Sequence, residues 1–238
     1  MIITEDSLNA LIKTPVVVLV EGADDVLFIK SLIGHLTKPQ EKNITASNLL
    51  IPEGLAIQDF EGSKIQKNLK QFLSLVKNSL PDEVNIRKII VMIDGDEKDR
   101  LEQCTQFYTE QFKVVPEYID TSVLTLKDFT KNQFQDLESL LLHIAKPEYQ
   151  KEKQVVQTFI DSAIQNKINS NWQPNKTRHP KRELAVFNAC LKDFQGTSAR
   201  VILNNFDKYF DITHEDLKPL LTLLKDALKV VTPDASTN

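Results

Sequence analysis

The feature that most constrains this fold is a pair of short apolar runs, each followed at once by an acidic residue. Val16–Val20 and Ile89–Ile93 are continuous and rich in β-branched side chains. Such runs are typical of strands that are buried on both faces, as in a parallel sheet. Glu21 follows the first run and Asp94 follows the second. A charge at the edge of an apolar core is costly unless it is paired, so these two acids need a physical reason.

Helical patterns alternate with the predicted strands in the first half of the chain. Apolar residues recur at helical spacing after each strand run, which indicates amphipathic helices that cover a sheet. Helices are predicted at Val26–Leu36, Ile65–Leu80 and Leu101–Phe112, and further strands at Ala56–Phe60 and Val114–Ile119. Strands that alternate with helices predict an α/β fold, with a mostly parallel, Rossmann-like sheet flanked by helices.

From Asp136 onwards the pattern is helical. Further helices are predicted at Leu137–Ile144, Val155–Ile168, Arg182–Leu191, Ala199–Phe206 and His214–Val231, with a polar loop at Asn169–Pro180. We therefore expect an α/β domain over residues 1–135 and a helical C-terminal part over residues 136–231 that packs on it. Residues 232–238 are polar and are expected to form a disordered tail.

Composition narrows the class of protein. The chain has 238 residues and a net charge of −4, so it is not a basic nucleic-acid coat protein. The only cysteines, Cys104 and Cys190, form no CxxC pair, which favours a reducing, cytoplasmic compartment over a disulfide or zinc framework. No apolar run reaches the length of a membrane span, and the N-terminus has no signal-peptide pattern, so no membrane association is expected.

The acids at the strand ends predict a metal site. The second run continues into Asp94-Gly95-Asp96. If the two strands are neighbours, Glu21, Asp94 and Asp96 converge outside the carboxyl ends of the sheet, where ligands bind in such folds. Converging carboxylates raise one another's pKa unless a cation neutralises them, and hard oxygen donors suit Mg²⁺ or Mn²⁺. Asp25 lies four residues after Glu21, and we expect it to face the same site from the first helical turn.

These residues resemble a known family. An apolar strand that ends in Glu-Gly, followed by a helix and a later strand that ends in Asp-x-Asp, is the pattern of Toprim domains. The stretches VEGADD and DLESLLL look most like OLD-type nucleases and small standalone bacterial Toprim proteins. The resemblance implies a Toprim fold in which Glu21, Asp94 and Asp96 bind the divalent metal. It also implies that Asp25 and Glu138 support a second ion, and that Lys181 is a catalytic lysine.

The same resemblance implies a function. It predicts Mg²⁺- or Mn²⁺-dependent cleavage of phosphodiester bonds in DNA or RNA, in bacterial or phage defence, beside an ATPase partner protein. No GxxxxGK[ST] sequence is present, so any ATPase activity belongs to a partner. The basic stretch Lys176–Arg182 is a candidate contact for the nucleic-acid backbone, or else a solvated loop.

Other interpretations of the acidic residues stay open. Many Toprim sites have the pattern DxDxE, but the third position here is Lys98, which leaves a non-catalytic metal- or nucleic-acid-binding regulatory module as an alternative. A phosphatase with Asp94 as its nucleophile is a third possibility, although it leaves Glu21 unexplained. Each acid taken alone is also compatible with capping of the following helix. The four histidines are far apart and show no metal-ligand spacing.

Overall fold

The fold is built on a parallel sheet. The computed structural model describes residues 4–41, 45–61, 64–94, 106–126, 136–165, 180–191 and 199–232. Within them, the sheet has four strands, all parallel, in the order β2-β1-β3-β4. The strands are β1 Val16–Val20, β2 Leu55–Asp59, β3 Lys88–Ile93 and β4 Asp120–Thr125. The predicted α/β class with a mostly parallel sheet is confirmed.

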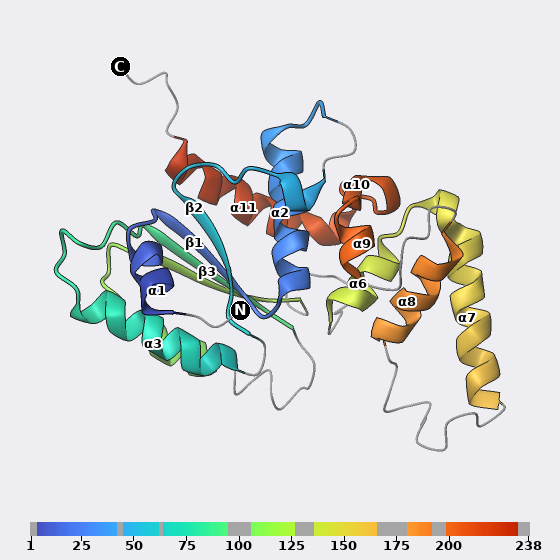
Figure 1. Cartoon of the computed structure of the whole chain (residues 1–238), viewed down its shortest axis with the longest axis horizontal. Coiled ribbons are helices and arrows are strands. Elements are labelled where there is room, and N and C mark those ends of the chain that lie inside the picture. The colour runs from blue at the N-terminus through green and yellow to red at the C-terminus, as the bar shows by residue number, and fades with distance from the viewer. Residues whose placement is uncertain are drawn as a thin grey trace.

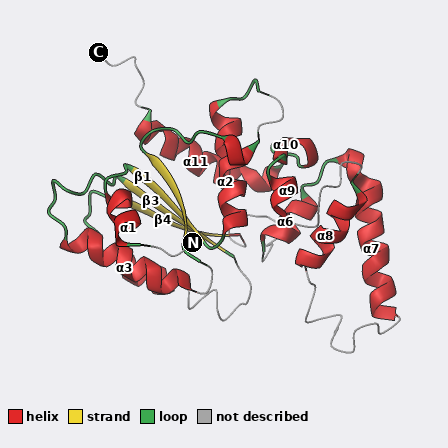
Figure 2. Cartoon of the chain, viewed as in Figure 1, coloured by secondary structure: helices red, strands yellow, loops and turns green. Residues whose placement is uncertain are grey.

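Helices cover both faces of this sheet (Figures 1 and 2). Alternate residues of β1 and β3 belong to two separate apolar clusters, as the two-residue period of a strand requires. Val17, Leu19 and their neighbours in β3 pack against α1 and α3. Val18, Val20 and Ile90 pack against α2 and helices of the C-terminal part. The strands are buried on both faces, which explains their uninterrupted apolar sequence.

The described helices fall into a first group that precedes β3 in the chain and a second group that follows β4. The first group is α1 Glu5–Ile12, α2 Ala23–Thr37, η1 Ala46–Asn48 and α3 Ile65–Asn78. The second is α6 Leu137–His143, η3 Pro147–Tyr149, α7 Gln150–Gln165, α8 Pro180–Cys190, α9 Ala199–Leu203, α10 Phe206–Tyr209, η4 Glu215–Leu217 and α11 Lys218–Val231. In Figure 1, α2 stands between the sheet and α6–α10, and α11 returns to the sheet. None of the described helices is long and apolar enough to span a membrane.

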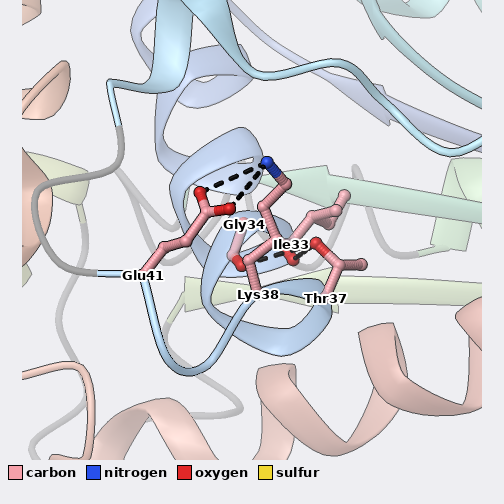
Figure 3. Close-up of polar contacts among 5 residues, drawn as sticks. All are labelled: Ile33, Gly34, Thr37, Lys38 and Glu41. Carbon is pink, nitrogen blue, oxygen red and sulfur yellow. Dashed lines mark hydrogen bonds and ion pairs between the residues drawn. The ribbon is translucent and has the colours of Figure 1, made fainter.

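The two ends of α2 show how the local sequence sets helix limits. At its start, the backbone N–H of Gly22 donates to the Asp25 carboxylate over 2.8 Å. Figure 3 shows the other end, where the Thr37 hydroxyl donates to the Ile33 carbonyl oxygen at 2.9 Å. Lys38 then leaves the helical conformation and pairs with Glu41 at 3.1 Å. The helix α2 therefore begins at the acidic turn after β1 and ends at the polar residues Thr37 and Lys38.

One predicted strand is wrong. Val114–Ile119 was expected to be extended, but residues 113–119 form turns and β4 begins at Asp120. Val115 and Ile119 are apolar because they pack in the cluster around α3, and Pro116 interrupts the run. The helix α1 was not predicted; Thr4 begins it through a reciprocal side-chain cap with Ser7.

Several predicted features fall outside the described residues. These are Asp96, Lys98, the first part of the helix predicted at Leu101–Phe112, almost all of the loop Asn169–Pro180, and residues 233–238 of the tail. The other predicted helices correspond to described ones, although the last three residues of Val155–Ile168 lie outside the described residues, and Ala199–Phe206 and His214–Val231 are each divided between two helices.

Candidate active site

A cavity of about 400 Å³ lies at the carboxyl ends of β1, β2 and β3. Seven acidic residues and two basic ones contribute to its walls. The acids are Glu21, Asp24, Asp25, Asp59, Glu61, Asp94 and Glu138, and the bases are Lys181 and Arg200. Gly22, Ala23 and Leu137 complete the lining.

The topology of the sheet explains this position. From β1 the chain passes through α2 to β2 on one side, and from β2 it passes through α3 to β3 on the other side of β1. The crevice between β1 and β3 is therefore the point where the strand order reverses, which is the usual ligand site of open α/β sheets. β1 and β3 pair in parallel, so Glu21 and Asp94 leave the sheet at the same edge.

Asp25 is a strongly perturbed acid of the cavity. Its side chain lies in the first turn of α2 and the residue is only 8% exposed. Burial, the largest cause, and the charges of Glu21, Glu138 and Asp24 together raise the pKa of Asp25 from 3.8 to about 7, against the lowering effect of the Gly22 N–H. Several negative groups thus share one small volume at neutral pH, an arrangement that a cation would relieve.

Glu138 reaches the cavity from the C-terminal half of the chain. It lies in the first turn of α6, whose start is fixed by Asp136 accepting the Ser139 N–H at 2.7 Å. Burial raises the pKa of Glu138, and Lys181 acts in the opposite direction. The Lys181 ammonium is 3.8 Å from the Glu138 carboxylate.

Two cations from the C-terminal helices stand at the rim. Lys181 is in α8, and 86% of its side chain is exposed. Arg200 is in α9, and its Nε is 3.2 Å from the carboxylate of Asp24. The Arg200–Asp24 pair is exposed and adds little to stability, so Arg200 can exchange its partner for a ligand anion at small cost, whereas Lys181 pairs with the buried Glu138.

The end of β2 adds two further acids. Asp59 is the last residue of the strand, and its carboxylate accepts the Glu61 N–H at 2.6 Å. Glu61 has φ of 62°, in the left-handed region that a residue with a side chain seldom occupies. Its carboxylate is 2.7 Å from Lys64, which lowers the pKa of Glu61. Strained backbone of this kind gathers at ligand sites.

The residues predicted for the site can now be located. Glu21, Asp25, Asp94, Glu138 and Lys181 all line this cavity, whereas Asp96 lies outside the described residues. Asp24, Asp59, Glu61 and Arg200 were not predicted as site residues. Glu61 directly follows the predicted strand Ala56–Phe60, so the placement that revealed Glu21 and Asp94 could have revealed Glu61. Arg200 carries no such signal, because only tertiary packing brings α9 to the sheet edge.

The donor set fits a hard divalent cation. Carboxylate oxygens are the ligands that Mg²⁺ and Mn²⁺ prefer, and the described lining contains neither thiolate nor imidazole. Glu21, Asp25, Asp94 and Glu138 are the residues that would hold such an ion.

One family comparison covers nearly the whole of this architecture. A family model described as "Protein of unknown function (DUF3226)" matches residues 15–229. The chain belongs to this family. The matched region begins just before β1 and ends in α11, so the DUF3226 region includes the strands and the C-terminal helices that line the cavity. Searches of curated proteins and of solved structures gave no match.

Proposed function

We propose that the protein is a Mg²⁺- or Mn²⁺-dependent nuclease that hydrolyses phosphodiester bonds of nucleic acid. One observation carries the proposal: acids from β1, β3, α2 and α6 surround one cavity, and two cations stand at its rim. The acidic side chains of the cavity suit divalent cations. Lys181 and Arg200 at the rim suit the phosphate that these cations would bind. The resemblance of VEGADD and the strand-end Asp94 to Toprim nucleases supports the same conclusion.

The side chains of the cavity have distinct roles in this proposal. Glu21 holds metal or accepts the proton of the attacking water. Asp94 anchors metal together with Asp96, and Asp25 and Glu138 support a second ion. When bound, the ions supply Lewis-acid stabilisation of the phosphate and lower the pKa of water. Lys181 and Arg200 offset negative charge that develops on the phosphate oxygens.

The exposed rim favours a polymeric substrate. Lys181 belongs to the basic stretch Lys176–Arg182 that is predicted to contact a backbone, and its side chain is 86% exposed. A backbone that passes over the rim would meet Lys181 and Arg200 from two different helices. Cytoplasmic location, a role in bacterial or phage defence and an ATPase partner belong to the same proposal and come from the sequence alone.

A second candidate function is a regulatory module that binds metal or nucleic acid without turnover. Lys98 favours it, because many Toprim sites carry an acid at that position. In this case the cavity would bind its ligands, and the chemistry would be absent.

Cleavage assays separate these functions. Labelled single- and double-stranded DNA and RNA are incubated with the full chain in Mg²⁺, in Mn²⁺ or in EDTA. We expect metal-dependent cleavage that falls by about 10²-fold or more in Glu21→Gln, the size of effect seen when a general base is removed. Glu53→Gln is the matched control, because Glu53 is an exposed acid away from the cavity.

Each other outcome has a defined meaning. Metal and nucleic-acid binding with no cleavage would support the regulatory module. Turnover of a small phosphomonoester with a covalent phosphate on Asp94 would support a phosphatase. Equal cleavage by Glu21→Gln and Glu53→Gln would contradict the proposed role of the cavity.

A further inference from the structure

A second group of metal-ligating side chains lies outside the acidic cavity. His143 ends α6, and His214 and Asp216 flank the first residue of η4. One ligand atom from each of the three lies within 4.8 Å of the others. The His143 Nε2 is 3.3 Å from the Asp216 carboxylate, and the His214 Nδ1 is 3.5 Å from the same oxygen.

Backbone contacts hold the two segments together. Ala145 forms an antiparallel bridge with Phe210, and the Asp211 N–H donates to the Ile144 carbonyl oxygen at 2.8 Å. The His214 N–H then donates to the Asp211 carbonyl oxygen at 3.1 Å. The end of α6 is thereby fixed beside the turn that precedes η4, and the two imidazole rings meet edge to face with centroids 4.9 Å apart. The juxtaposition is a product of the fold, since these histidines are distant in sequence.

The two imidazoles and the carboxylate of this group are suitable ligands for a metal cation. Asp216 is only 1% exposed, and a buried carboxylate is costly unless positive charge or donors surround it. The His214 Nδ1 accepts the Asp216 N–H at 3.3 Å, so this nitrogen presents a lone pair beside the carboxylate rather than a proton. The His143 Nε2 approaches the same carboxylate oxygen, so an ion among the three side chains would be within reach of two imidazole nitrogens and one carboxylate oxygen. An ion there would replace this long hydrogen bond.

We propose that His143, His214 and Asp216 form a zinc site. Zn²⁺ binds imidazole nitrogen and carboxylate oxygen at about 2.0–2.2 Å, so two ligands of a tetrahedral site are about 3.3 Å apart. The observed separations of 3.3 and 3.5 Å from the Asp216 oxygen match that value. The histidine side chains remain 38% and 26% exposed, which leaves room for water as the fourth ligand.

The two metal sites differ in preference. Imidazole ligands favour zinc and related transition metals, whereas the all-carboxylate cavity favours Mg²⁺ or Mn²⁺. His143 is five residues from Glu138 on α6, about 8 Å along the helix axis. Zinc at the end of α6 would fix the helix that carries Glu138 into the cavity. The zinc proposal itself does not depend on catalysis in that cavity.

Zinc binding to the full, metal-stripped chain tests the proposal. Zn²⁺ is titrated against a chromophoric chelator in excess Mg²⁺, which occupies the carboxylate cavity. We expect one zinc ion per chain in the wild type and in Glu21→Gln. His143→Gln and His214→Gln should each weaken binding by more than about tenfold, since loss of an outer partner of a ligand already costs that much. His35→Gln, on α2 outside the group, is the matched control and should bind as the wild type does.

The variants are chosen at half-exposed positions so that folding is preserved, which circular dichroism checks; Asp216 is avoided because it is buried. Substitution with Co²⁺ adds a direct readout, because tetrahedral cobalt gives strong visible absorption that both histidine variants should lose. Zinc binding that is absent in the wild type, or equal in His143→Gln, His214→Gln and His35→Gln, would overturn the proposal.

Discussion

Asp25 is the residue that most directly connects stability with the candidate site. It is buried among Glu21, Glu138 and Asp24, and its pKa is raised to about 7. The folded protein therefore binds a proton at this position over a pH range in which the unfolded chain has released it. Without metal, the contribution of Asp25 to stability is most favourable near pH 4 and is lost as the pH rises towards 7.

Asp25→Asn should remove this dependence. The amide keeps an oxygen that can accept the Gly22 N–H, and it carries no charge at any pH. In EDTA at pH 8, the variant should be more stable than the wild type by on the order of 2 to 4 kcal/mol, and the difference should vanish below about pH 4. Urea unfolding at a series of pH values measures it.

Addition of Mg²⁺ should reverse the order. Binding to the folded state stabilises the wild type by mass action, and Asp25→Asn should gain less because it lacks a carboxylate ligand. Asp82→Asn is the matched control, since Asp82 is exposed in the turn before β3 and away from the cavity. If Asp25→Asn and Asp82→Asn shift the free energy of unfolding equally at pH 8, burial of the Asp25 charge does not destabilise the folded state as proposed.

Single residues were predicted from sequence only where a pattern marked them. Glu21 and Asp94 follow uninterrupted apolar runs, so the fold class itself placed them at one sheet edge. Arg200 and His143 have no local pattern, because their partners Asp24 and Asp216 come from other segments. The expectation that the histidines lack metal-ligand spacing holds along the sequence, but the fold brings His143 and His214 together.

At the scale of elements, the turn before β2 is tightly constrained. Gly54 has φ of +84°, and a Cβ there would lie 3.1 Å from a methyl of Val231 in α11. Its carbonyl oxygen also accepts the Val16 N–H at 2.9 Å at the start of β1. Gly54 therefore sets both the entry to β2 and the approach of α11 to the sheet.

Gly54→Ala should lower the free energy of unfolding by about 1 to 3 kcal/mol, because alanine is strained at this φ and crowds α11. The midpoint of urea unfolding measures the change. Gly22→Ala is the matched control: its φ of −146° suits any residue, and its Cβ would meet nothing closer than 3.6 Å. Gly22 is the N-cap of α2, where alanine is less favourable than glycine, so we expect a loss for the control that is smaller than the loss in Gly54→Ala. Equal loss in both variants would contradict the assignment of a special turn to Gly54.

Strands that are buried on both faces were easier to predict from the sequence than a strand that is only partly buried. β1 and β3 are buried on both faces, so their composition alone identified them. β4 has mixed burial, and its sequence DTSVLT gives a weaker signal than the apolar turn before it, which is why the strand was expected too early. The tertiary position of short helices such as α9 and α10 depends on contacts with α2, which no local pattern specifies.

At the scale of the molecule, the cavity is shared between the sheet and the C-terminal helices. The sheet edge and α2 supply most of the acids, whereas Glu138, Lys181 and Arg200 come from helices that pack beyond α2. The two parts share one apolar cluster, which includes Val18 of β1 and Leu224 of α11. The helices thus provide the positive charge that the sheet edge lacks, and nucleic-acid affinity should depend on them.

The double substitution Lys181→Gln with Arg200→Gln tests this division of roles. Placed in the cleavage-deficient Glu21→Gln background, it should weaken binding of labelled nucleic acid in Mg²⁺ and reduce its salt dependence. Each lost phosphate contact lowers the slope of log K against log salt by about 0.9 on a duplex, so two contacts lower it by about 1.8. Fluorescence anisotropy over a series of KCl concentrations gives both quantities.

The control removes the same charge elsewhere. Lys225→Gln with Lys229→Gln changes two exposed lysines of α11 that do not line the cavity. Its salt slope should stay close to that of the Glu21→Gln parent, because general loss of positive charge acts only at long range and is screened. If both double variants lower the slope equally, nucleic acid does not cross the rim at Lys181 and Arg200. The rest of the basic stretch Lys176–Arg182 would then have to bind the backbone without Lys181, and the link between the rim and the acidic cavity would be lost.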